Sequence, residues 1–216
     1  MIYDFVKRCI DIIGSSVLII FFSPIVIPLA IFIKLTSEGP IFATPQRVGK
    51  EGRLFKMFKF RSMYMYQIKG KMVHAEKYLE SNPKLMAAYQ KNSYKLKNDP
   101  RITPVGKFIR RFSLDEIPQI FNVLLGDMSL VGPRAYQQDE LEHQQKVYPQ
   151  TTKYVKIILK ARPGASGPWQ VSGRSFINFD KRVEMDAKYI QRRSILYDIW
   201  IVLETPTAML TGRGAI

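Results

Sequence analysis

The stretch "IIGSSVLIIFFSPIVIPLAIFI", residues 12 to 33, decides the fold, because it carries no ionisable side chain for 22 positions. A helix of about 20 apolar residues is long enough to cross the hydrocarbon core of a bilayer. Lys7 and Arg8 precede this run, and Lys34 follows it before a basic body begins. Since positive flanks favour the cytoplasmic side, both ends are drawn to the same face of the membrane.

Ser23 and Pro24 stand at the midpoint of the apolar run. Proline removes a backbone donor and kinks a helix, and a neighbouring hydroxyl can satisfy the carbonyl that is freed. A re-entrant helix–break–helix would return to the same membrane face, whereas a spanning anchor needs only the length of the run. At this point the two topologies are equally open. A cleaved signal peptide is disfavoured, because the run is too long and no small-residue cleavage site follows it.

Length and charge limit what the rest of the chain can be. The 216 residues suffice for one ordinary domain besides the membrane segment. Thirty-three Lys and Arg against eighteen Asp and Glu give a net charge of +15, which indicates a polyanionic partner: nucleic acid, an anionic leaflet or phosphorylated small molecules. The single cysteine excludes a disulfide framework and a cysteine zinc site, and the two histidines lie in separate polar segments.

Residues 39 to 63 read as extended chain around a turn at positions 49 to 52, which predicts a short β-hairpin. In "FKFRSM" (58–63), Lys59 and Arg61 share one face of a strand at a spacing of about 7 Å. Two cations so placed can bind phosphates, and a solvated strand face is the alternative. The polar, lysine-rich residues 70–98 predict a helical insert that is interrupted at Asn82 and Pro83.

Two amphipathic helices are predicted in "TPVGKFIRRFSLDEIPQIFNVLLG", residues 103 to 126. Thr103 and Pro104 have the residue types of an N-cap and a first helical position. Apolar residues then recur at i, i+3, i+4 and i+7, first from Val105 and again after Leu114. The second helix is expected to start at Leu114.

Adjacent carboxylates, Asp115 and Glu116, fall at the junction of these two helices, within reach of Arg110. Ser113 and Glu116 also spell a capping box, which would be a purely structural role. The catalytic alternative rests on chemistry, because paired carboxylates suit Mg²⁺ together with substrate phosphate oxygens. A carboxylate can also attack phosphorus to form an acyl phosphate. No glycine-rich Rossmann turn, Walker A loop or nucleophile elbow competes with this site.

Two later loops can meet a ligand. "GDMSLVGPRAY" (126–136) presents Arg134 after a glycine–proline turn, and "ARPGASGPWQVSGRS" (161–175) contains Gln170 and Arg174 among three glycines. A connecting loop without function is the alternative for the second of these. The C-terminal "SILYDIWIVLETPTAMLTG" is interrupted by charges and proline, so it predicts an interfacial or core-packed helix rather than a second span.

Four blocks, "KFRSM", "SLDEIPQIFNVLLGDMSLVGPR", "RPGASGPWQVSGRS" and "GRGAI", resemble in order the signature blocks of the bacterial sugar transferase family. Its members are monotopic polyprenyl-phosphate phosphoglycosyl transferases. "LKNDPRITPVGKFIRRFSLDE" further resembles the subgroup that transfers hexose 1-phosphate. The resemblance implies a mostly helical α+β fold: a re-entrant membrane hairpin at 1–36, then a small cytoplasmic catalytic domain at 37–216 with amphipathic interfacial helices and a short β-hairpin.

The resemblance also implies the reaction and its partners. A UDP-sugar would donate hexose 1-phosphate to polyprenyl (undecaprenyl) phosphate, releasing UMP, as the first membrane step of exopolysaccharide, O-antigen or capsule assembly. The protein would lie on the cytoplasmic face of the bacterial inner membrane among anionic lipids, with no nucleic-acid partner, and a homodimer is left open.

Carried over by position, the family pattern makes Asp115 the nucleophile that becomes a covalent sugar-phosphoryl aspartate, and gives Asp115 and Glu116 the Mg²⁺. The other residues that match the family's motifs are expected to bind phosphates (Lys59, Arg61, Arg110, Arg134), to meet the nucleotide or sugar (Gln170, Arg174) and to form the helix break (Ser23, Pro24). That last match turns the even choice of topology toward the re-entrant hairpin.

Two positions depart from the family pattern: Ala135 stands where proline is usual, and Ser166 where threonine is common. The first is expected to loosen the loop that carries Arg134. Two other functions remain as alternatives. One is a membrane-anchored scaffold that binds lipid or nucleotide without catalysis, in which "SLDE" is only a cap. The other is direct, single-displacement transfer with Asp115 acting as a base or metal ligand.

Overall fold

A computed structural model describes residues 2–92, 96, 98–173 and 177–211. Within this part the chain is mostly helical, as the sequence predicted, with short strands. The helices are α1 (Ile2–Thr36), α2 (Ala75–Glu80), α3 (Pro83–Lys91), α4 (Pro104–Arg111), α5 (Gln119–Leu125), α6 (Gln138–Val147), α7 (Thr152–Ile158), α8 (Pro168–Ser172), α9 (Phe179–Arg192) and α10 (Ile195–Leu210). The strands are β1 (Phe42–Ala43), β2 (Gln46–Val48), β3 (Leu54–Lys56), β4 (Lys59–Phe60), β5 (Met65–Ile68), β6 (Lys71–His74), β7 (Ser129–Val131) and β8 (Gly164–Ser166).

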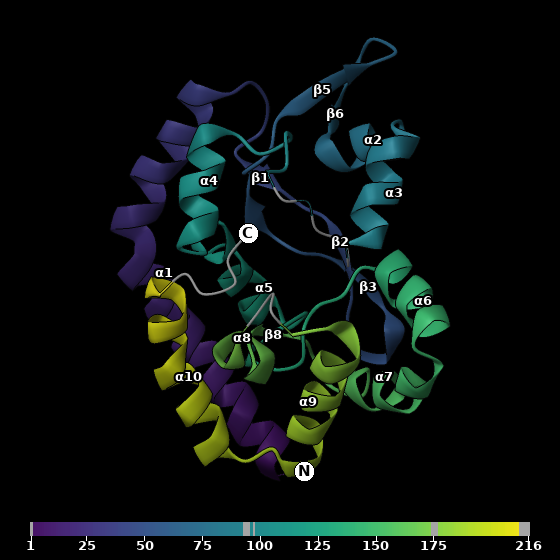
Figure 1. Ribbon diagram of the computed structural model, residues 1–216. Helices are drawn as coiled ribbons and strands as arrows, with labels where there is room; N and C mark the ends of the chain where they lie inside the picture. The colour runs from purple at the N-terminus through teal and green to yellow at the C-terminus, as the bar shows by residue number, and fades with distance from the viewer. Residues whose placement is uncertain (1, 93–95, 97, 174–176, 212–216) are drawn as a thin grey trace.

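α1 continues through Ser23 and Pro24, so the predicted helix–break–helix is corrected to one uninterrupted helix. Pro24 leaves the carbonyl of Ile20 without its i→i−4 donor, and the Ser23 hydroxyl donates to that carbonyl at 2.8 Å. The serine therefore satisfies the freed carbonyl as expected, and in doing so lets the helix continue. Figure 1 shows α1 changing direction along its length, as expected of a helix that contains proline.

Among the described residues, α1 is the one helix long and apolar enough to cross a membrane, with a mean hydropathy of 2.7 over its most apolar window. It is nevertheless fixed to the rest of the chain at both ends. Near its start, Asp11 accepts from the Ser129 hydroxyl (3.0 Å) and the Leu130 amide (2.9 Å) of β7. Near its end, Ile33 packs against Phe60 in a buried cluster.

Short antiparallel pairs connect these helices. β2 and β3 pair around the turn Lys50–Gly52, which confirms the predicted hairpin. β5 and β6 form a second hairpin, joined by Lys69 and Gly70 with φ of 49° and 75°. Two central residues with positive φ are typical of a type I′ turn. The predicted helical insert is therefore wrong over its first residues, which belong to β6. The helices α2 and α3 follow, and Asn82 caps α3, confirming the predicted interruption.

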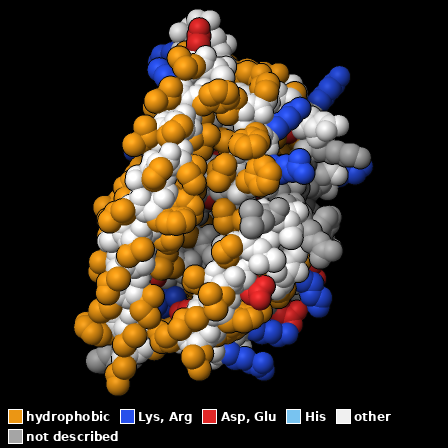
Figure 2. Space-filling view, turned by 90° about the vertical axis from the view of Figure 1, so that its left-hand side faces the viewer, with side chains coloured by type: hydrophobic (Ala, Val, Ile, Leu, Met, Phe, Trp, Pro, Cys, Tyr) orange, Lys and Arg blue, Asp and Glu red, His pale blue; other side chains and the backbone are white. Residues whose placement is uncertain are grey.

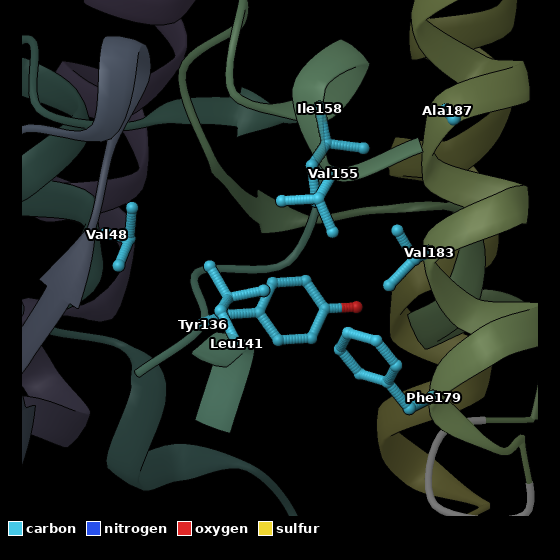
Figure 3. Close-up of a cluster of buried hydrophobic side chains, with 8 residues drawn as sticks. All are labelled: Val48, Tyr136, Leu141, Val155, Ile158, Phe179, Val183 and Ala187. Atoms are coloured by element: carbon cyan, nitrogen blue, oxygen red, sulfur yellow. The ribbon is translucent and has the colours of Figure 1, made fainter. Parts of the chain in front are cut away.

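A buried apolar cluster joins α6, α7 and α9, and Figure 3 shows its side chains. The rings of Tyr136 and Phe179 meet edge to face at 5.6 Å between centroids. Tyr136 is 1 % exposed and follows Arg134 by two residues. Packing of this ring therefore holds the end of the loop that carries Arg134.

One face of the molecule is apolar and exposed (Figure 2). It extends along α1 and includes side chains of α4, α5 and α10. The large hydrophobic side chains exposed in α4, α5 and α10 are Phe108, Phe121, Leu124, Leu125, Leu196, Ile199, Trp200, Val202 and Leu203. The predicted apolar stripes of α4 and α5 thus turn partly outward, since Phe108 is 58 % exposed while Ile109 is fully buried. An apolar face of this extent is typical of a membrane interaction surface.

Candidate active site

Asp115 and Glu116, which form an acidic dyad, lie in a tight turn after α4. The Gly106 amide donates to the Thr103 hydroxyl at 2.8 Å, which confirms the predicted cap at the start of α4. After the helix ends, Ser113 adopts a left-handed conformation with φ 55° and ψ 24°. A 3₁₀ turn, Leu114–Glu116, follows directly. This turn carries both Asp115 and Glu116.

The predicted capping box is wrong, and so is the helix start at Leu114. The Glu116 amide donates to the backbone carbonyl of Ser113 (3.1 Å), and the Ser113 side chain makes no cap hydrogen bond. An α-helix from Leu114 would need an amide at position 118 to bond its carbonyl. Pro118 has none, so α5 begins only at Gln119. Glu116 is thereby left available for a partner other than its own helix.

Lys59 forms an ion pair with Glu116 and also faces Asp115. Its Nζ lies 2.8 Å from Glu116 Oε1 and 3.8 Å from Asp115 Oδ2, so one ammonium group faces both carboxylates. The Asp115 side chain is 10 % exposed, and those of Lys59 and Glu116 are 22 % and 34 % exposed. The structure therefore brings three of the predicted site residues into one partly open ionic cluster.

Backbone contacts fix the strand that carries Lys59. Lys59 pairs with Ala43 of β1, and the buried Asn122 of α5 bonds the chain just before β4. Its amide oxygen accepts from the Phe58 amide, and its nitrogen donates to the Lys56 carbonyl, both at 2.8 Å. Asn122 is a positioning residue that sequence reasoning missed. The sequence feature that could have indicated this role is an amide side chain on the inward side of an otherwise apolar helix.

Electrostatics set the protonation of Asp115. Burial raises the pKa of this carboxyl above its ordinary value, and the neighbouring Glu116 adds to the rise. The cations Lys59 and Arg110 lower the pKa again. Arg110 thus lies within electrostatic range of the dyad, as the predicted junction required. Because burial dominates, the pKa of Asp115 is raised overall, and the two cations reduce the rise.

Arg134 reaches the same region from the loop after β7. Burial lowers its pKa, but the acidic Glu140 and Glu116 outweigh this effect together with Tyr136, so the pKa is raised. Glu116 and Arg134 are therefore electrostatic neighbours. The guanidinium carbon lies 4.8 Å from the centre of the Trp169 ring. This contact joins the two loops in which the sequence predicted ligand-binding residues.

A second buried acidic group, Asp186, bonds the backbone of Arg134. Asp186 of α9 is fully buried and accepts from the Arg134 amide at 2.9 Å. Burial raises the pKa of Asp186 to about 7, although the Arg134 amide and the cations Arg182 and Arg134 oppose the rise. Arg182 also faces Glu140 at 3.6 Å. Sequence reasoning missed this cluster. The sequence pattern that could have indicated it is Arg182 and Asp186, two opposite charges four residues apart on the apolar side of α9.

The remaining candidates are placed as follows. Arg61 is 3 % exposed, and its guanidinium donates to the Ser37 carbonyl (2.7 Å) and to the Glu38 carbonyl, so the structure uses it to fix the end of α1. Its phosphate-binding role stays a prediction. Gln170 lies in α8 rather than in the predicted loop and donates to the Ala165 carbonyl of β8 at 3.1 Å. Arg174 lies outside the described residues.

The two departures from the family pattern are accommodated. Ala135 is 9 % exposed and packs in an apolar cluster with Met57, while the amide of Arg134 keeps its bond to Asp186. The hydroxyl of Ser166 lies 2.6 Å from that of Thr205. Neither departure removes a contact that places the dyad.

The dyad fits a magnesium ion in its donor chemistry. Two adjacent carboxylates already share one cationic group, the Lys59 ammonium, and carboxylate oxygens are ligands that Mg²⁺ prefers. The described residues contain no group of three or more acidic, histidine or cysteine ligands. Asp115 and Glu116 would therefore hold the ion together with substrate phosphate oxygens and water.

Comparison of the sequence with known proteins identifies the family of the chain. A sequence model of the bacterial sugar transferase family matches residues 2–212. The chain is 44 % identical over 212 residues to the undecaprenyl-phosphate galactose phosphotransferase of Salmonella typhimurium, covering 98 % of this chain and 42 % of that protein. It is 37 % identical over 209 residues to the exopolysaccharide production protein ExoY of Rhizobium meliloti, covering 97 % of this chain and 87 % of that protein.

A third relative is the UDP-glucose:undecaprenyl-phosphate glucose-1-phosphate transferase of Escherichia coli. The identity is 36 % over 204 residues, covering 92 % of this chain and 39 % of that protein. The chain thus spans less than half the length of several relatives that it matches. With the dyad placed beside Lys59, Arg110 and Arg134, and with the family's pattern matched from residue 2 to residue 212, the chain belongs to the bacterial sugar transferase family.

Proposed function

We propose that the protein transfers a hexose 1-phosphate from a UDP-sugar to undecaprenyl phosphate, with release of UMP. The observation that carries this proposal is the cluster in which Lys59 faces both Asp115 and Glu116. Two of the relatives named above are described as transferring galactose phosphate and glucose 1-phosphate to undecaprenyl phosphate, which supports the substrate class. The net charge of +15 suits a reaction whose two substrates are both polyanions.

In the proposed reaction, an Asp115 carboxylate oxygen attacks the sugar-bearing phosphorus of the donor. The bond between this phosphorus and the oxygen that bridges to the uridine phosphate breaks, and UMP leaves with the electron pair. An oxygen of undecaprenyl phosphate then attacks the same phosphorus. The carboxylate of Asp115 is regenerated, and the product is a lipid diphosphate that carries the sugar.

The surrounding residues support this chemistry through charge. Lys59 and Arg110 lower the pKa of Asp115, which favours the ionised nucleophile. Arg134 approaches Glu116 from the opposite loop, and Asp186 fixes its backbone. Cations fixed around a transferring phosphoryl group stabilise its negative charge without reorganising. Mg²⁺ held by Asp115 and Glu116 would supply further neutralisation of the phosphate oxygens.

We further infer that the protein lies on the cytoplasmic face of the bacterial inner membrane and does not cross it. Both ends of α1 are fixed to the same body, through Asp11 to β7 and through Ile33 to Phe60. A helix that crossed the bilayer would have its two ends on opposite sides. The exposed apolar side of α1 instead continues onto α10 as one face, which suits immersion in one leaflet.

A panel of UDP-sugars tests the function. Purified protein receives Mg²⁺, undecaprenyl phosphate and one UDP-sugar at a time, and UMP release and lipid-linked product are measured. We expect UMP and product in equal amounts for at least one UDP-hexose. A protein that binds the donors but releases no UMP with any of them would be a scaffold, which contradicts the proposal.

A further inference from the structure

The end of the molecule at the start of α1 contains a hollow that the transfer reaction does not use. It lies where α1 begins, beside the junction of α9 and α10 (Figure 1). The hollow offers about 460 Å³, part of it open to solvent. Neither the dyad nor Lys59 is among its lining residues.

Cations dominate this lining. It contains six basic side chains and two acidic ones. The basic residues are Lys7, Arg8, Lys50, Lys160, Arg162 and Arg193, and the acidic ones are Asp4 and Asp11. Such an excess over a concave surface concentrates a positive potential.

Half of these cations are already neutralised. Lys7 pairs with Asp198 at 2.7 Å, Arg193 with Asp4 at 2.9 Å, and Lys50 with its neighbour Glu51 at 3.7 Å. These ion pairs fix side chains in the wall of the hollow. The remaining positive charge of the hollow therefore comes from the other three cations.

The remaining three cations form no ion pair within the described part of the chain, although Asp11 lies within electrostatic range of Arg8. Arg8 donates to the carbonyls of Val123 and Leu124, at the end of α5, at 2.7 and 2.9 Å. Arg162 donates to the Gly126 carbonyl, just past the same helix, at 2.7 Å. Lys160 is exposed and has no ion pair there. Carbonyl partners orient a guanidinium group but leave its full charge, so the hollow keeps an uncompensated positive charge.

The hollow also borders the apolar face. Phe5 and Val6 are 72 % and 36 % exposed on the same turns of α1 that carry Lys7 and Arg8. Leu196 is 80 % exposed, three residues after Arg193. An anionic group in the hollow would therefore have an exposed apolar surface beside it. Free phosphate would bind only the cations of the hollow, whereas a lipid would bind the cations through its headgroup and the apolar surface through its acyl chains.

From these observations we propose that the hollow binds the phosphate headgroup of an anionic membrane lipid, with its acyl chains against the start of α1 and α10. Arg8, Lys160 and Arg162 supply the charge for the headgroup. This site would fix the depth and rotation of the start of α1 in the leaflet. The proposal does not rest on the transfer reaction, because no residue of the dyad takes part.

Native mass spectrometry of the full chain in detergent tests the site. The probe is dioleoylphosphatidylglycerol, and dioleoylphosphatidylcholine with the same acyl chains is the comparison. We expect one saturable phosphatidylglycerol adduct per chain. The change Lys160→Gln/Arg162→Gln should weaken it about tenfold or more, given the contribution of each cation near anionic lipid. Lys146→Gln/Lys156→Gln removes two exposed cations from α6 and α7, outside the hollow, and should leave the adduct unchanged.

A second variant guards against misfolding. Lys160→Glu alters one exposed side chain and should abolish the preference for phosphatidylglycerol while leaving the melting temperature unchanged. Equal adducts in the wild type and both hollow variants would overturn the proposal. So would equal binding of the two lipids. Inorganic phosphate that binds as tightly as phosphatidylglycerol would overturn the lipid as the source of the phosphate group.

Discussion

Two buried acidic groups, Asp115 and Asp186, share an electrostatic signature and differ in what surrounds them. Burial raises the pKa of both carboxyls. Asp115 faces the side chain of Lys59 in a partly open cluster, whereas Asp186 is fully buried and accepts a backbone amide. A raised pKa alone therefore does not identify the nucleophile. The bonded partners differ: the Lys59 ammonium faces the Asp115 carboxylate, whereas the backbone amide of Arg134 donates to Asp186.

Replacing each group by its amide should separate the two roles. Asp115→Asn should lower transfer at least about a thousandfold, because the nucleophile is lost. It should lower the free energy of unfolding by no more than about 1 kcal/mol, since burial already disfavours the charged form. Asp186→Asn keeps an oxygen that can accept from the Arg134 amide, so transfer should stay within about tenfold of wild type.

Steady-state UMP release and thermal unfolding check both variants, with Asp139→Asn on the exposed side of α6 as the control. Transfer that survives Asp115→Asn and is lost in Asp186→Asn would reverse the assignment.

Lys59 is expected to give the next largest effect. Lys59→Gln removes the cation that faces both carboxylates and should lower transfer about a hundredfold. It should also shift the acidic limb of the pH–rate profile to higher pH, because Lys59 lowers the pKa of Asp115. Lys56→Gln, an exposed change on β3, is the matched control. An unchanged acidic limb would mean that another group controls the ionisation.

Asp186 should matter more for stability. Asp186→Ala leaves the buried Arg134 amide without its acceptor and should lower the free energy of unfolding by about 1–3 kcal/mol. Chemical denaturation measures the change, and Glu142→Ala on the exposed side of α6 is the control. A loss no larger than in the control would show that Asp186 does not hold the Arg134 loop.

The last prediction is a pH dependence of stability. A carboxyl whose pKa is about 7 when folded and near 4 when unfolded binds more protons in the folded state between these values. Its stabilising contribution is present at low pH and lost as the pH rises through about 7. Asp186→Asn should therefore gain melting temperature relative to wild type between about pH 4 and 7. A constant difference would contradict the raised pKa.

The sequence predicted those elements that local chemistry determines. Thr103 and Pro104 start α4 as expected, and the Ser23 hydroxyl satisfies a freed carbonyl as expected. The capping box failed, because a left-handed Ser113 places the dyad in a 3₁₀ turn and Pro118 delays the helix. Motif chemistry singled out Asp115 and Glu116, and their role stays a prediction; their local geometry depended on backbone conformation that the residue types did not reveal.

Long-range contacts were beyond the reach of sequence patterns. Asp186 bonds an amide 52 positions earlier in the chain, and Asn122 bonds residues more than sixty positions away. Periodicity shows which side of a helix is apolar but not which loop packs there. The buried partners of Arg134 and of the strand carrying Lys59 therefore became visible only in three dimensions.

The covalent step through Asp115 can be tested in a single reaction that lacks the lipid acceptor. Purified protein is mixed with a UDP-hexose that it accepts and Mg²⁺, without any lipid acceptor, and UMP and intact mass are followed together. We expect up to one equivalent of UMP and an increase in protein mass equal to one hexose phosphate on Asp115. Adding undecaprenyl phosphate should then remove that mass. No burst and no adduct, in protein that turns over normally once lipid is present, would contradict the account and favour direct transfer.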